Sequence, residues 1–549
     1  MNRQSNSKWA AVVLSMAMLT AAACTQGDSK TAEQPKTDGK GQPADAPKAA
    51  ASGKPQLPLV TKPTELSFFV QLDSKVSATK KSYAELSIFP YLEKETGIKI
   101  NFVHPPSGME KEQFNLMVAS GELPDMISNN WIQYPGGPAK AVGDGVIIKL
   151  NDLVDKYAPN FKKFLNDNPD IKKDVLMDDG TIYAIPLVRK ERVQRYTSGL
   201  QIRQDWLDKV GMKVPDTMDD WYAVLKAFKE KDPGGTGKVI PFGNSNDLAV
   251  RNFMAAWGMA YGFYIVDGKV KYGPNEPDYK PFLTTIKKWY DEGLIDPDFA
   301  STDSKQFDAK ITGNRIGAYS ALLNGGMGRY LDLMKNDPNF KLAGVAPPLT
   351  KDGKRYNFQS AVLTGYDGSG VGISSKSKKT EEAIKWLDLG YTEWGHNIFN
   401  FGIEGESYNW MNGYPKYTDA VLKHPSLSPT NALSQYTIAD LYGRFFNQDE
   451  RKAEQLLIYP AQKEAGPNWA KGTPERQYPM GVTPTLDEGR KLASIMNEVN
   501  TYVDQMFLKF IMGNEPLTKF DDYAAKLKQM KVDEAVSIQQ AAYDRYLKR

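Results

Sequence analysis

The only cysteine among 549 residues, Cys24, lies where an apolar run gives way to polar sequence, so the chain forms no disulfide within itself. Arg3 and Lys8 precede this run, which covers residues 9–23. The run is too short to span a bilayer, which needs about 20 apolar residues. A basic start, an apolar middle and an exit of small residues are the three parts of a secretory signal. We therefore expect residues 1–23 to be a signal peptide and the rest of the chain to be exported.

The residues just before the cysteine resemble a bacterial lipobox, in which the thiol is diacylated and becomes the new N-terminus. The small residues Ala21, Ala22 and Ala23 precede Cys24, although the lipobox pattern prefers Leu at the position of Ala21, and Leu19 lies further back. The alternative is an ordinary signal peptide followed by an incidental cysteine. A lone thiol with no partner is a liability in an oxidising exterior, so we expect lipid attachment (palmitate) at Cys24.

Residues 24–62 contain no aromatic residue and are rich in Lys, Ala, Gly, Pro and Asp. Such a segment cannot bury enough apolar surface to fold. As a flexible chain it has an r.m.s. reach of roughly 35 Å. We expect a disordered tether from a lipid anchor on the extracellular face of the cytoplasmic membrane to a folded part. No membrane span is expected after residue 63.

The composition of the remaining chain narrows its function. It is long enough for two to three domains or two large lobes. The net charge of +3 gives no electrostatic case for binding nucleic acid. Three scattered histidines, His104, His396 and His424, do not support a zinc site. Most of the 28 Tyr and 10 Trp belong to the core, but aromatic faces in a cleft also suit stacking on sugar rings.

Strand-like and helix-like segments alternate along the first part of the chain. Residues 65–72 and 98–104 have strand patterns, and 82–97 and 109–121 have helix patterns that end at glycine. Alternating elements of this kind favour an α/β fold, with strands between helices. From about residue 416 the pattern is mostly helical.

The segment 121–137 carries a resemblance to a known family. Gly121, Pro124, Asp125 and the apolar pair after them follow a helix pattern, as in the extracellular solute-binding proteins that serve bacterial ABC importers. Further segments resemble the family in the family's order. These are DGTIYAIP (179–186), LQIRQDWLDKVGMKVPDTMDDW (200–221), FDAKITGNRIGAYSA (307–321), GVAPPL (344–349), NFGIEGESYNWMNGYPKYTD (400–419) and residues 501–546. The last two are similar to a large subgroup that includes lipoproteins of Gram-positive soil bacteria and the alginate-binding proteins.

The resemblance implies a two-lobed, periplasmic-binding-protein-like fold of type II, α/β in class, with a helix-rich C-terminal part. Its two lobes are discontinuous in sequence and close on a ligand. By analogy with maltose-binding proteins, lobe 1 is expected at 63–190 and 360–400, and lobe 2 at 195–350 and 410–549. The chain is expected to cross between lobes near residues 188–199, 350–360 and 401–408.

One departure from the alginate-binding relatives concerns calcium. Their loop is patterned Asp-x-Asn-x-Asn-x-Lys-x-Asp-Glu, whereas this chain reads DPGGTGKVIP over residues 232–241. Asp232 and Lys238 remain, but Gly234 and Thr236 replace the two asparagines and the Asp-Glu pair is missing. Calcium takes six to eight oxygen ligands. We therefore expect no calcium here, and no other cofactor.

A sugar site needs flat apolar faces for the ring and planar polar groups for the hydroxyls. The candidate ligand residues are Asn129, Asn130, Trp131, Arg203, Trp257, Tyr319, Asn324, Glu404, Glu406, Tyr408 and Trp410. Each has an ordinary structural alternative. Arg203 is favoured to pair with a neighbouring Asp, and Trp257 to lie in the core. If residues 404–410 are extended, alternation puts the four even-numbered side chains on one face, which either lines the cleft or packs the hinge.

The resemblance implies the substrate receptor of an ABC importer, which captures an oligosaccharide and presents it to membrane permeases without making or breaking a bond. The ligand is expected to be plant-derived, and the charge permits uronic acids; peptide ligands stay open. A monomer is expected. One alternative is a secreted glycoside hydrolase or polysaccharide lyase, which needs two carboxylates about 5–10 Å apart across a cleft. Another is a sugar sensor or adhesin built on the same fold.

Overall fold

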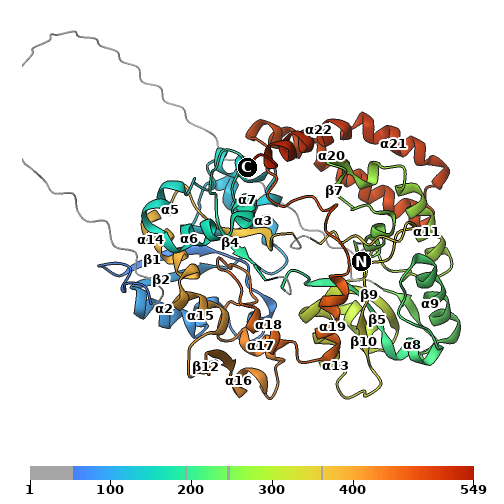
Figure 1. Cartoon of the computed structure of the whole chain (residues 1–549), viewed down its shortest axis with the longest axis horizontal. Helices are drawn as coiled ribbons and strands as arrows, with labels where there is room; N and C mark the ends of the chain where they lie inside the picture. The colour runs from blue at the N-terminus through green and yellow to red at the C-terminus, as the bar shows by residue number, and fades with distance from the viewer. Residues whose placement is uncertain (1–53, 192–193, 244–247, 360–362) are drawn as a thin grey trace, which may run out of the picture. The chain divides into compact units, whose positions relative to one another are not determined.

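The computed structural model describes residues 54–191, 194–243, 248–359 and 363–549 (Figure 1). The expected signal peptide, Cys24 and most of the expected tether lie outside the described residues. No helix within those four ranges is both long and apolar enough to cross a membrane.

The folded part begins before residue 63. The backbone N–H of Leu59 donates to the carbonyl of Thr96 (2.9 Å), and Lys54 pairs with Glu95 (2.5 Å). Leu59 and Val60 pack against the first core defined below. The last residues of the expected tether are therefore held on helix α2 (Ile88–Thr96), because these two apolar side chains are available for burial.

The first sheet has five strands in the order β2-β1-β3-β11-β4. Its strands are β1 (Thr64–Phe69), β2 (Ile98–Val103), β3 (Met126–Asn130), β4 (Ile185–Val188) and β11 (Tyr366–Ile373). β1 is parallel to β2 and β3, whereas β11 runs antiparallel to both its neighbours. The register pairs Phe68 with Phe102 and Gly370 with Asn129. The carboxyl ends of β1, β2, β3 and β4 therefore share one edge with the amino end of β11.

Helices cover this sheet and bury one continuous apolar cluster, the first core, which includes Leu66, Met126, Ile185, Val371 and Trp386. The covering helices include α2, α5 (Asn151–Tyr157), α6 (Pro159–Asp167) and α14 (Thr380–Asp388). The predicted helix ends are confirmed, because Gly97 and Gly121 cap α2 and α3 (Glu110–Ser120) with φ of 75° and 70°. Glycine takes this left-handed conformation without steric cost.

The second sheet has four strands in the order β10-β5-β9-β6. These strands are β5 (Ser198–Arg203), β6 (Ile240–Phe242), β9 (Ile316–Leu322) and β10 (Leu342–Gly344). β6 and β9 are parallel, and β5 is antiparallel to β9 and β10. The second core includes Ile202, Trp206, Trp221, Phe242 and Ala318. The mixed α/β architecture agrees with the fold class expected from the sequence.

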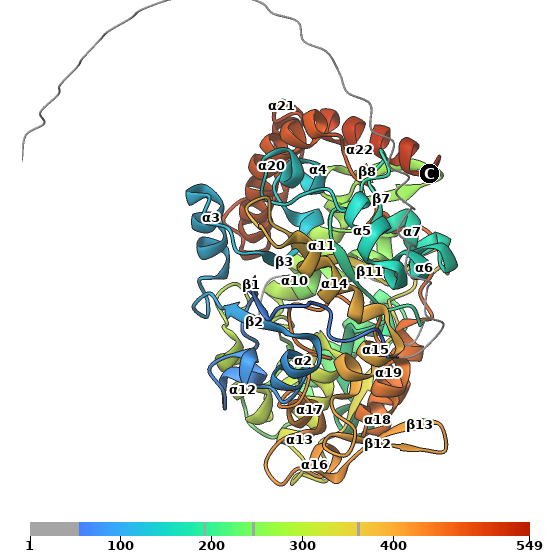
Figure 2. The same cartoon turned by 90° about the vertical axis from the view of Figure 1, so that its left-hand side faces the viewer.

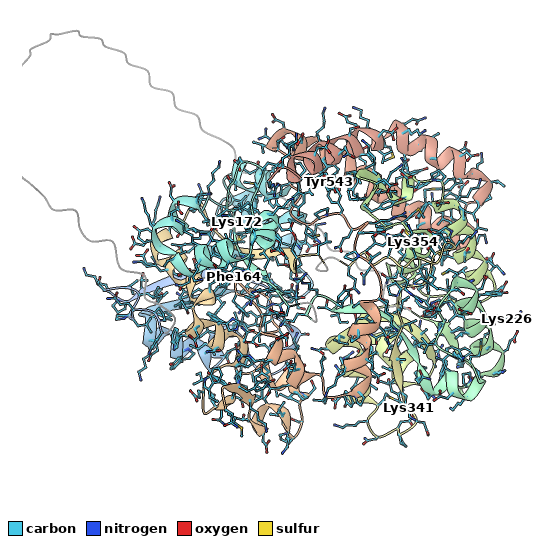
Figure 3. All side chains as sticks on the ribbon, in the orientation of Figure 1. Phe164, Lys172, Lys226, Lys341, Lys354 and Tyr543 are labelled. Atoms are coloured by element: carbon cyan, nitrogen blue, oxygen red, sulfur yellow. The ribbon has the colours of Figure 1, made fainter. Side chains whose placement is uncertain are left out.

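Helices α8 (Gln204–Val210), α9 (Met218–Lys231) and α11 (Tyr279–Asp291) pack in this second core. A capping box starts α9, in which Thr217 and Asp220 satisfy each other's backbone N–H groups. This box follows from the Thr-x-x-Asp spacing. In Figure 3, Phe164 belongs to the first-sheet helices and packs against the first core, while Lys226 extends from α9 with half its side chain exposed.

The C-terminal part is helical, as expected. Its helices are α20 (Leu486–Met512), α21 (Phe520–Gln529) and α22 (Val532–Tyr546). α20 packs on α11 and on α4 (Gly137–Gly143), and α22 packs on strand β8 (Lys269–Tyr272). Figure 2 shows α4 beside α20 and β8 beside α22. Arg545 of α22 also pairs with Asp178, which follows the first-sheet helices, at 2.6 Å.

The chain passes between the two sheets three times. Residues 189–197 join β4 to β5, and residues 345–365 join β10 to β11. The third passage is 457–459, between α18 (Glu450–Leu456) and α19 (Pro460–Trp469), and α19 packs on β10. This differs from the crossing expected at 401–408. Phe445 and Phe446 belong to the first core and pack on Phe399, so the chain up to α18 stays with the first sheet rather than joining lobe 2 at 410.

Candidate functional site

Polar side chains gather at the carboxyl edge of the first sheet. In α/β sheets this is the edge at which ligands bind. Asn130 ends β3 and donates through Nδ2 to the carbonyl of Asp367 (2.9 Å), which lies at the start of antiparallel β11. Arg189 follows β4 and pairs with the Asp367 carboxylate (Nη1–Oδ2 2.7 Å). Burial acts to raise the pKa of Asp367, but Arg189 outweighs it and holds this pKa below its usual range.

The loop 438–448 extends this edge beyond β4. The N–H of Val188 donates to the carbonyl of Phe446 (3.2 Å), so the loop continues the backbone pairing of the sheet. Its tip carries Tyr442, with 48% of the residue exposed, and the half-buried Arg444. We call the carboxyl edge of the first sheet, with this loop and the segment 71–75 after β1, the first edge.

Gly443 places this loop tip against the end of β1. Its φ is 82°, and a Cβ there would lie 2.8 Å from Cγ2 of Val70. No side chain fits this approach. Only glycine lets Tyr442 and Arg444 flank the carboxyl end of β1.

The second sheet has a matching edge, the second edge, at the carboxyl end of β9. Ser320 accepts a hydrogen bond there from Asn252 Nδ2 (Oγ, 3.0 Å), and Leu322 is more than half exposed. Ser198, at the amino end of antiparallel β5, accepts from Gln359 Nε2 (3.3 Å). The second edge thus offers hydroxyl and amide groups beside one exposed apolar side chain.

Three glutamines lie in or beside the passages between the sheets. Gln194 is buried, and neither its amide oxygen nor its amide nitrogen has a hydrogen-bond partner among the described residues. The amide oxygens of Gln359 and Gln477 are likewise unpaired there, although Gln477 Nε2 donates to the carbonyl of Gln359. Unpaired buried polar groups are costly, so these amides are available to a ligand, to water or to each other in another arrangement.

Of the residues predicted from the sequence, the structure places two on the first edge. Asn129 and Asn130 are half-buried at the end of β3. Trp131, next to them, is fully buried, and its indole N–H donates to the carbonyl of Gly370 (3.2 Å). Its ring is edge-on to Phe114, so it presents no free face to a sugar in this structure.

Of the two predicted residues in and after β9, Tyr319 lies in the protein interior and Asn324 lies just beyond the second edge, half-buried. Tyr319 is fully buried, edge-on to Phe307 and Tyr330, and burial raises the pKa of its hydroxyl. Asn324 follows β9 and accepts from Gln462 Nε2 (3.1 Å).

Arg203 and Trp257 adopt their structural alternatives. Arg203 ends β5 at the opposite edge from Ser198 and pairs with Asp205 through Nε (2.8 Å) and Nη2 (2.7 Å). Trp257 is half-buried, lies edge-on to Phe282 (5.5 Å) and packs against the second core.

The condition set for residues 404–410, that the whole segment is extended, is not met in the structure. Residues 405–407 form a turn, and β12 (Tyr408–Met411) then pairs with β13 (Tyr414–Tyr417) in a hairpin. The glycine at 405 has φ 85°, which favours the turn over a continuing strand. Glu404 and Glu406 are exposed, and Glu406 accepts from Ser87 Oγ (2.6 Å).

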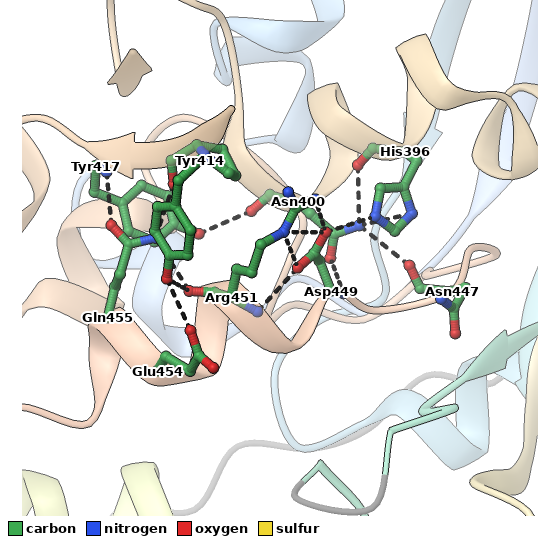
Figure 4. Close-up of polar contacts among 10 residues, drawn as sticks. His396, Asn400, Tyr414, Tyr417, Asn447, Asp449, Arg451, Glu454 and Gln455 are labelled. Atoms are coloured by element: carbon green, nitrogen blue, oxygen red, sulfur yellow. Dashed lines mark hydrogen bonds and ion pairs between the residues drawn. The ribbon is translucent and has the colours of Figure 1, made fainter. Parts of the chain in front are cut away.

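The hairpin is attached to a polar network instead of to a crossing (Figure 4). Tyr408 is buried, and Trp410, 38% exposed, lies 5.9 Å from the guanidinium carbon of Arg451. Arg451 in turn pairs with Asp449, which also accepts from His396 Nε2 (3.0 Å). Burial acts to raise the pKa of Asp449, but Arg451 and His396 outweigh it and hold this pKa well below its usual range.

The loop compared with a calcium site does not fit that metal. Asp232 accepts from the N–H of Gly237 (Oδ2, 2.6 Å), and the carbonyl of Pro233 accepts from the ammonium of Lys209 (2.8 Å). Asn314 Nδ2 donates to the carbonyl of Gly234 (2.9 Å). Three of the loop's oxygens are thus engaged by protein donors, one of them a cation, whereas Oδ1 of Asp232 has no hydrogen-bond partner among the described residues. Throughout the described ranges, no group of three or more His, Cys, Asp or Glu is placed to hold a metal ion.

Sequence reasoning missed Arg189, Asp367, Tyr442 and Arg444. The two arginines stand in segments without a periodic pattern, and their proximity depends on pairing between strands far apart in sequence. The one local signal for these residues was the sequence Tyr-Gly-Arg at 442–444, in which a single glycine separates an aromatic residue from an arginine.

Comparison with known proteins identifies the family. The model for bacterial extracellular solute-binding proteins matches residues 73–393, more than half of the chain. The chain belongs to this family. This solute-binding protein is 28% identical over 497 residues to the fructooligosaccharide ABC transporter substrate-binding protein FusA of Streptococcus pneumoniae, covering 84% of this chain and 87% of FusA. It is also 28% identical over 334 residues to the polygalacturonan/rhamnogalacturonan-binding protein YtcQ of Bacillus subtilis, covering 58% of this chain and 62% of YtcQ.

Solved structures agree with the fold. The alginate-binding protein AlgQ2 without calcium has a TM-score of 0.75 and 28% identity, over 88% of this solute-binding protein and 99% of AlgQ2. FusA of S. pneumoniae in complex with kestose has a TM-score of 0.71 and 24% identity, over 88% and 99% of the two chains, which shows likeness of fold. FusA is named as the substrate-binding protein of an ABC transporter, and YtcQ and AlgQ2 are named as polysaccharide-binding proteins.

Proposed function

We propose that this protein is the substrate-binding receptor of an ABC importer and that it takes an oligosaccharide between the first edge and the second edge. The observation that carries this proposal is the pair of polar strand-end edges, one with the exposed ring of Tyr442, joined by three chain passages. An aromatic face for the ring and planar amides for the hydroxyls are the groups that a sugar site requires. FusA and YtcQ are named for sugar ligands, so the similarity of this chain to them also supports a sugar ligand.

Binding acts through a shift of population. A ligand that contacts both edges stabilises only those arrangements in which the edges are close, because differential contact is what moves a conformational equilibrium. The passages at 189–197, 345–365 and 457–459 are the segments in which backbone dihedral changes accommodate this motion. No bond in the sugar is made or broken, and the receptor acts as a monomer.

The ligand residues that we keep from the sequence are Asn129 and Asn130, on the first edge. We propose further that Cys24 carries the lipid, that the segment up to residue 53 tethers the receptor outside the cell, and that membrane permeases accept the loaded form. The ligand is plant-derived in this proposal.

The test uses the chain from residue 25, which removes the signal peptide and the reactive thiol and keeps every described residue. Its thermal unfolding is measured with fructo-, galacturono-, mannurono- and arabino-oligosaccharides. At a hundredfold excess over its dissociation constant, a ligand adds about 2.7 kcal/mol of stability. Chromatography of the sugar after overnight incubation separates a receptor from a hydrolase or lyase. Stabilisation with intact sugar supports the proposal, and shortened or unsaturated products contradict it.

A further inference from the structure

Three cations at or beside the first edge are paired with carboxylates, whereas the exposed Lys190 and the half-buried Arg444 have no ion pair among the described residues. Three ion pairs are present there, Arg189–Asp367, Lys75–Asp73 and Lys452–Asp440. Arg444 forms no ion pair with any residue that the structure describes. Its one hydrogen bond is a long contact from Nη1 to the carbonyl of Ala439 (3.5 Å).

Arg444 is half-buried, so its free N–H groups are only partly compensated by water. Burial, together with the neighbouring charge of Arg189, lowers the pKa of Arg444. These two effects outweigh the carboxylates of Asp440, Asp367 and Asp73, which act to raise this pKa. Burial and the charge of Arg189 disfavour a bare cation at this place. An anion beside the guanidinium would compensate the positive charge of Arg444. A carboxylate is the best such anion, because guanidinium binds carboxylate through two parallel hydrogen bonds.

Each carboxylate near Arg444 already has a partner of its own, although Oδ2 of Asp440 has no hydrogen-bond partner among the described residues. Asp73, Asp367 and Asp440 each have a cation of their own within 2.7 Å. Glu110, which approaches Tyr442, accepts from Gln71 Nε2 (3.1 Å) and from the N–H of Gly108 (3.0 Å). The free donors of Arg444 are therefore left for a group from outside the protein.

Tyr442 supplies the second element of a sugar subsite. It lies two residues before Arg444 on the same loop tip, and nearly half of it is exposed. We propose that Arg444 and Tyr442 form a subsite for a uronic acid residue, in which Arg444 binds the sugar carboxylate and Tyr442 stacks on the apolar face of the ring. This inference rests on the proposed function and assigns the receptor to acidic oligosaccharides.

The experiment compares acidic sugars with the same sugars after their charge is removed. The probes are trigalacturonate and trimannuronate, the methyl ester of each, and neutral kestose. Calorimetric titrations are run with the wild-type chain from residue 25, Arg444→Gln, Arg444→Lys and Arg315→Gln. Arg315 is the matched control, because it is also half-buried and forms no ion pair among the described residues, but it directly precedes β9, at the far end from the second edge.

We expect an acidic trisaccharide to bind at least ten times more tightly than its methyl ester. Arg444→Gln should weaken binding of the acidic sugar by about 10- to 100-fold, because the charged hydrogen bonds to the carboxylate are lost. Its affinity for the methyl ester should be unchanged. Arg444→Lys keeps the charge but cannot form two parallel hydrogen bonds, so its affinity for the acidic sugar should lie between those of wild type and Arg444→Gln. Arg315→Gln should bind like wild type. Thermal unfolding of each variant shows that it is folded.

The other outcomes separate the two proposals. If kestose or an ester binds and neither acidic sugar binds more tightly than its ester, the uronate subsite is wrong and the receptor proposal stands. The subsite is also wrong if Arg444→Gln and Arg315→Gln bind the acidic sugar equally well. If no saccharide binds to the folded wild-type chain, the receptor proposal fails, and the subsite fails with it.

Discussion

Gly443 and Val70 approach each other so closely that a single methyl group between them is excluded. A Cβ at Gly443 would come within 2.8 Å of Val70 Cγ2, in a backbone conformation with φ of 82°. This contact ties the loop that carries Tyr442 and Arg444 to the end of β1. Stability and the ligand binding proposed for this loop therefore depend on the same structural element.

We predict that Gly443→Ala destabilises the protein by about 2–4 kcal/mol, because left-handed backbone strain of about 1 kcal/mol adds to the cost of overpacking. The variant should also bind sugar more weakly. Gly353→Ala is the matched control, since Gly353 has φ of 80° but no atom within 4 Å of the position that a Cβ would take there, and it should lose only the strain. Urea unfolding measures the free energy of unfolding of both variants. Equal losses in the two would show that the Val70 contact contributes nothing.

The buried pair of Arg203 and Asp205 predicts a large effect of removing one partner. Both side chains are nearly inaccessible, and Arg203 also stacks on Trp206 and Phe340. Asp205→Ala leaves a buried guanidinium uncompensated, so we expect a loss of about 3–5 kcal/mol in the free energy of unfolding. Asp155→Ala, which breaks an exposed pair with Lys162, should cost less than about 1 kcal/mol. Denaturant titration of the two variants under one set of conditions gives the comparison.

The depressed pKa of Asp449 predicts a pH dependence of stability. Because its folded-state value lies below that of the unfolded chain, about 3.9, its contribution is complete above that pH and is lost as the pH falls below it. We expect Asp449→Asn to lower the unfolding temperature at pH 7. Towards pH 3 the unfolding temperature of the variant should approach that of the wild-type protein. Asp419→Asn, at an exposed pair with Lys423, should show no such convergence. A difference for Asp449→Asn that stays constant from pH 7 to pH 3 would contradict the assignment.

The loop after α9 predicts that calcium does not change the stability of the protein. The Lys209 ammonium lies 2.8 Å from the Pro233 carbonyl, where it repels a divalent cation, and Asp232 is the one carboxylate of the loop. Adding millimolar calcium or EDTA should leave the unfolding temperature unchanged. Lys209→Ala should cost about 0.5–1 kcal/mol through the lost hydrogen bond, again without a response to calcium. A rise in unfolding temperature with calcium in the wild-type protein would show that this loop, or another site, binds the ion.

Local sequence signals predicted the elements that local interactions determine. The capping box of Thr217 and Asp220 and the helix ends at Gly97 and Gly121 involve residues within one turn, so the sequence shows them directly. The fold class followed from alternation and from the resemblance. The lobe boundaries stay a prediction, although the packing of residues 438–446 in the first core departs from them.

The candidate site was predicted less well, because burial of a side chain depends on distant partners. Trp131 lies between two asparagines and a glycine turn, which suggested exposure, yet β11 covers it and Gly370 accepts its N–H. Tyr319 is enclosed by Phe307 and Tyr330 in the same way. Conversely, nothing in the sequence around Arg444 shows that the carboxylates near it are already paired.

The ion pair between Arg189 and Asp367 has a mechanical consequence. Arg189 opens the passage at 189–197, and Asp367 follows the end of the passage at 345–365, so the pair fixes the two passages to each other where they meet the first sheet. A rotation of one sheet against the other must then be shared by both passages. Two segments pinned at a common origin have fewer independent degrees of freedom than two separate ones, and this restricts the rotation to a narrow family of axes through that point.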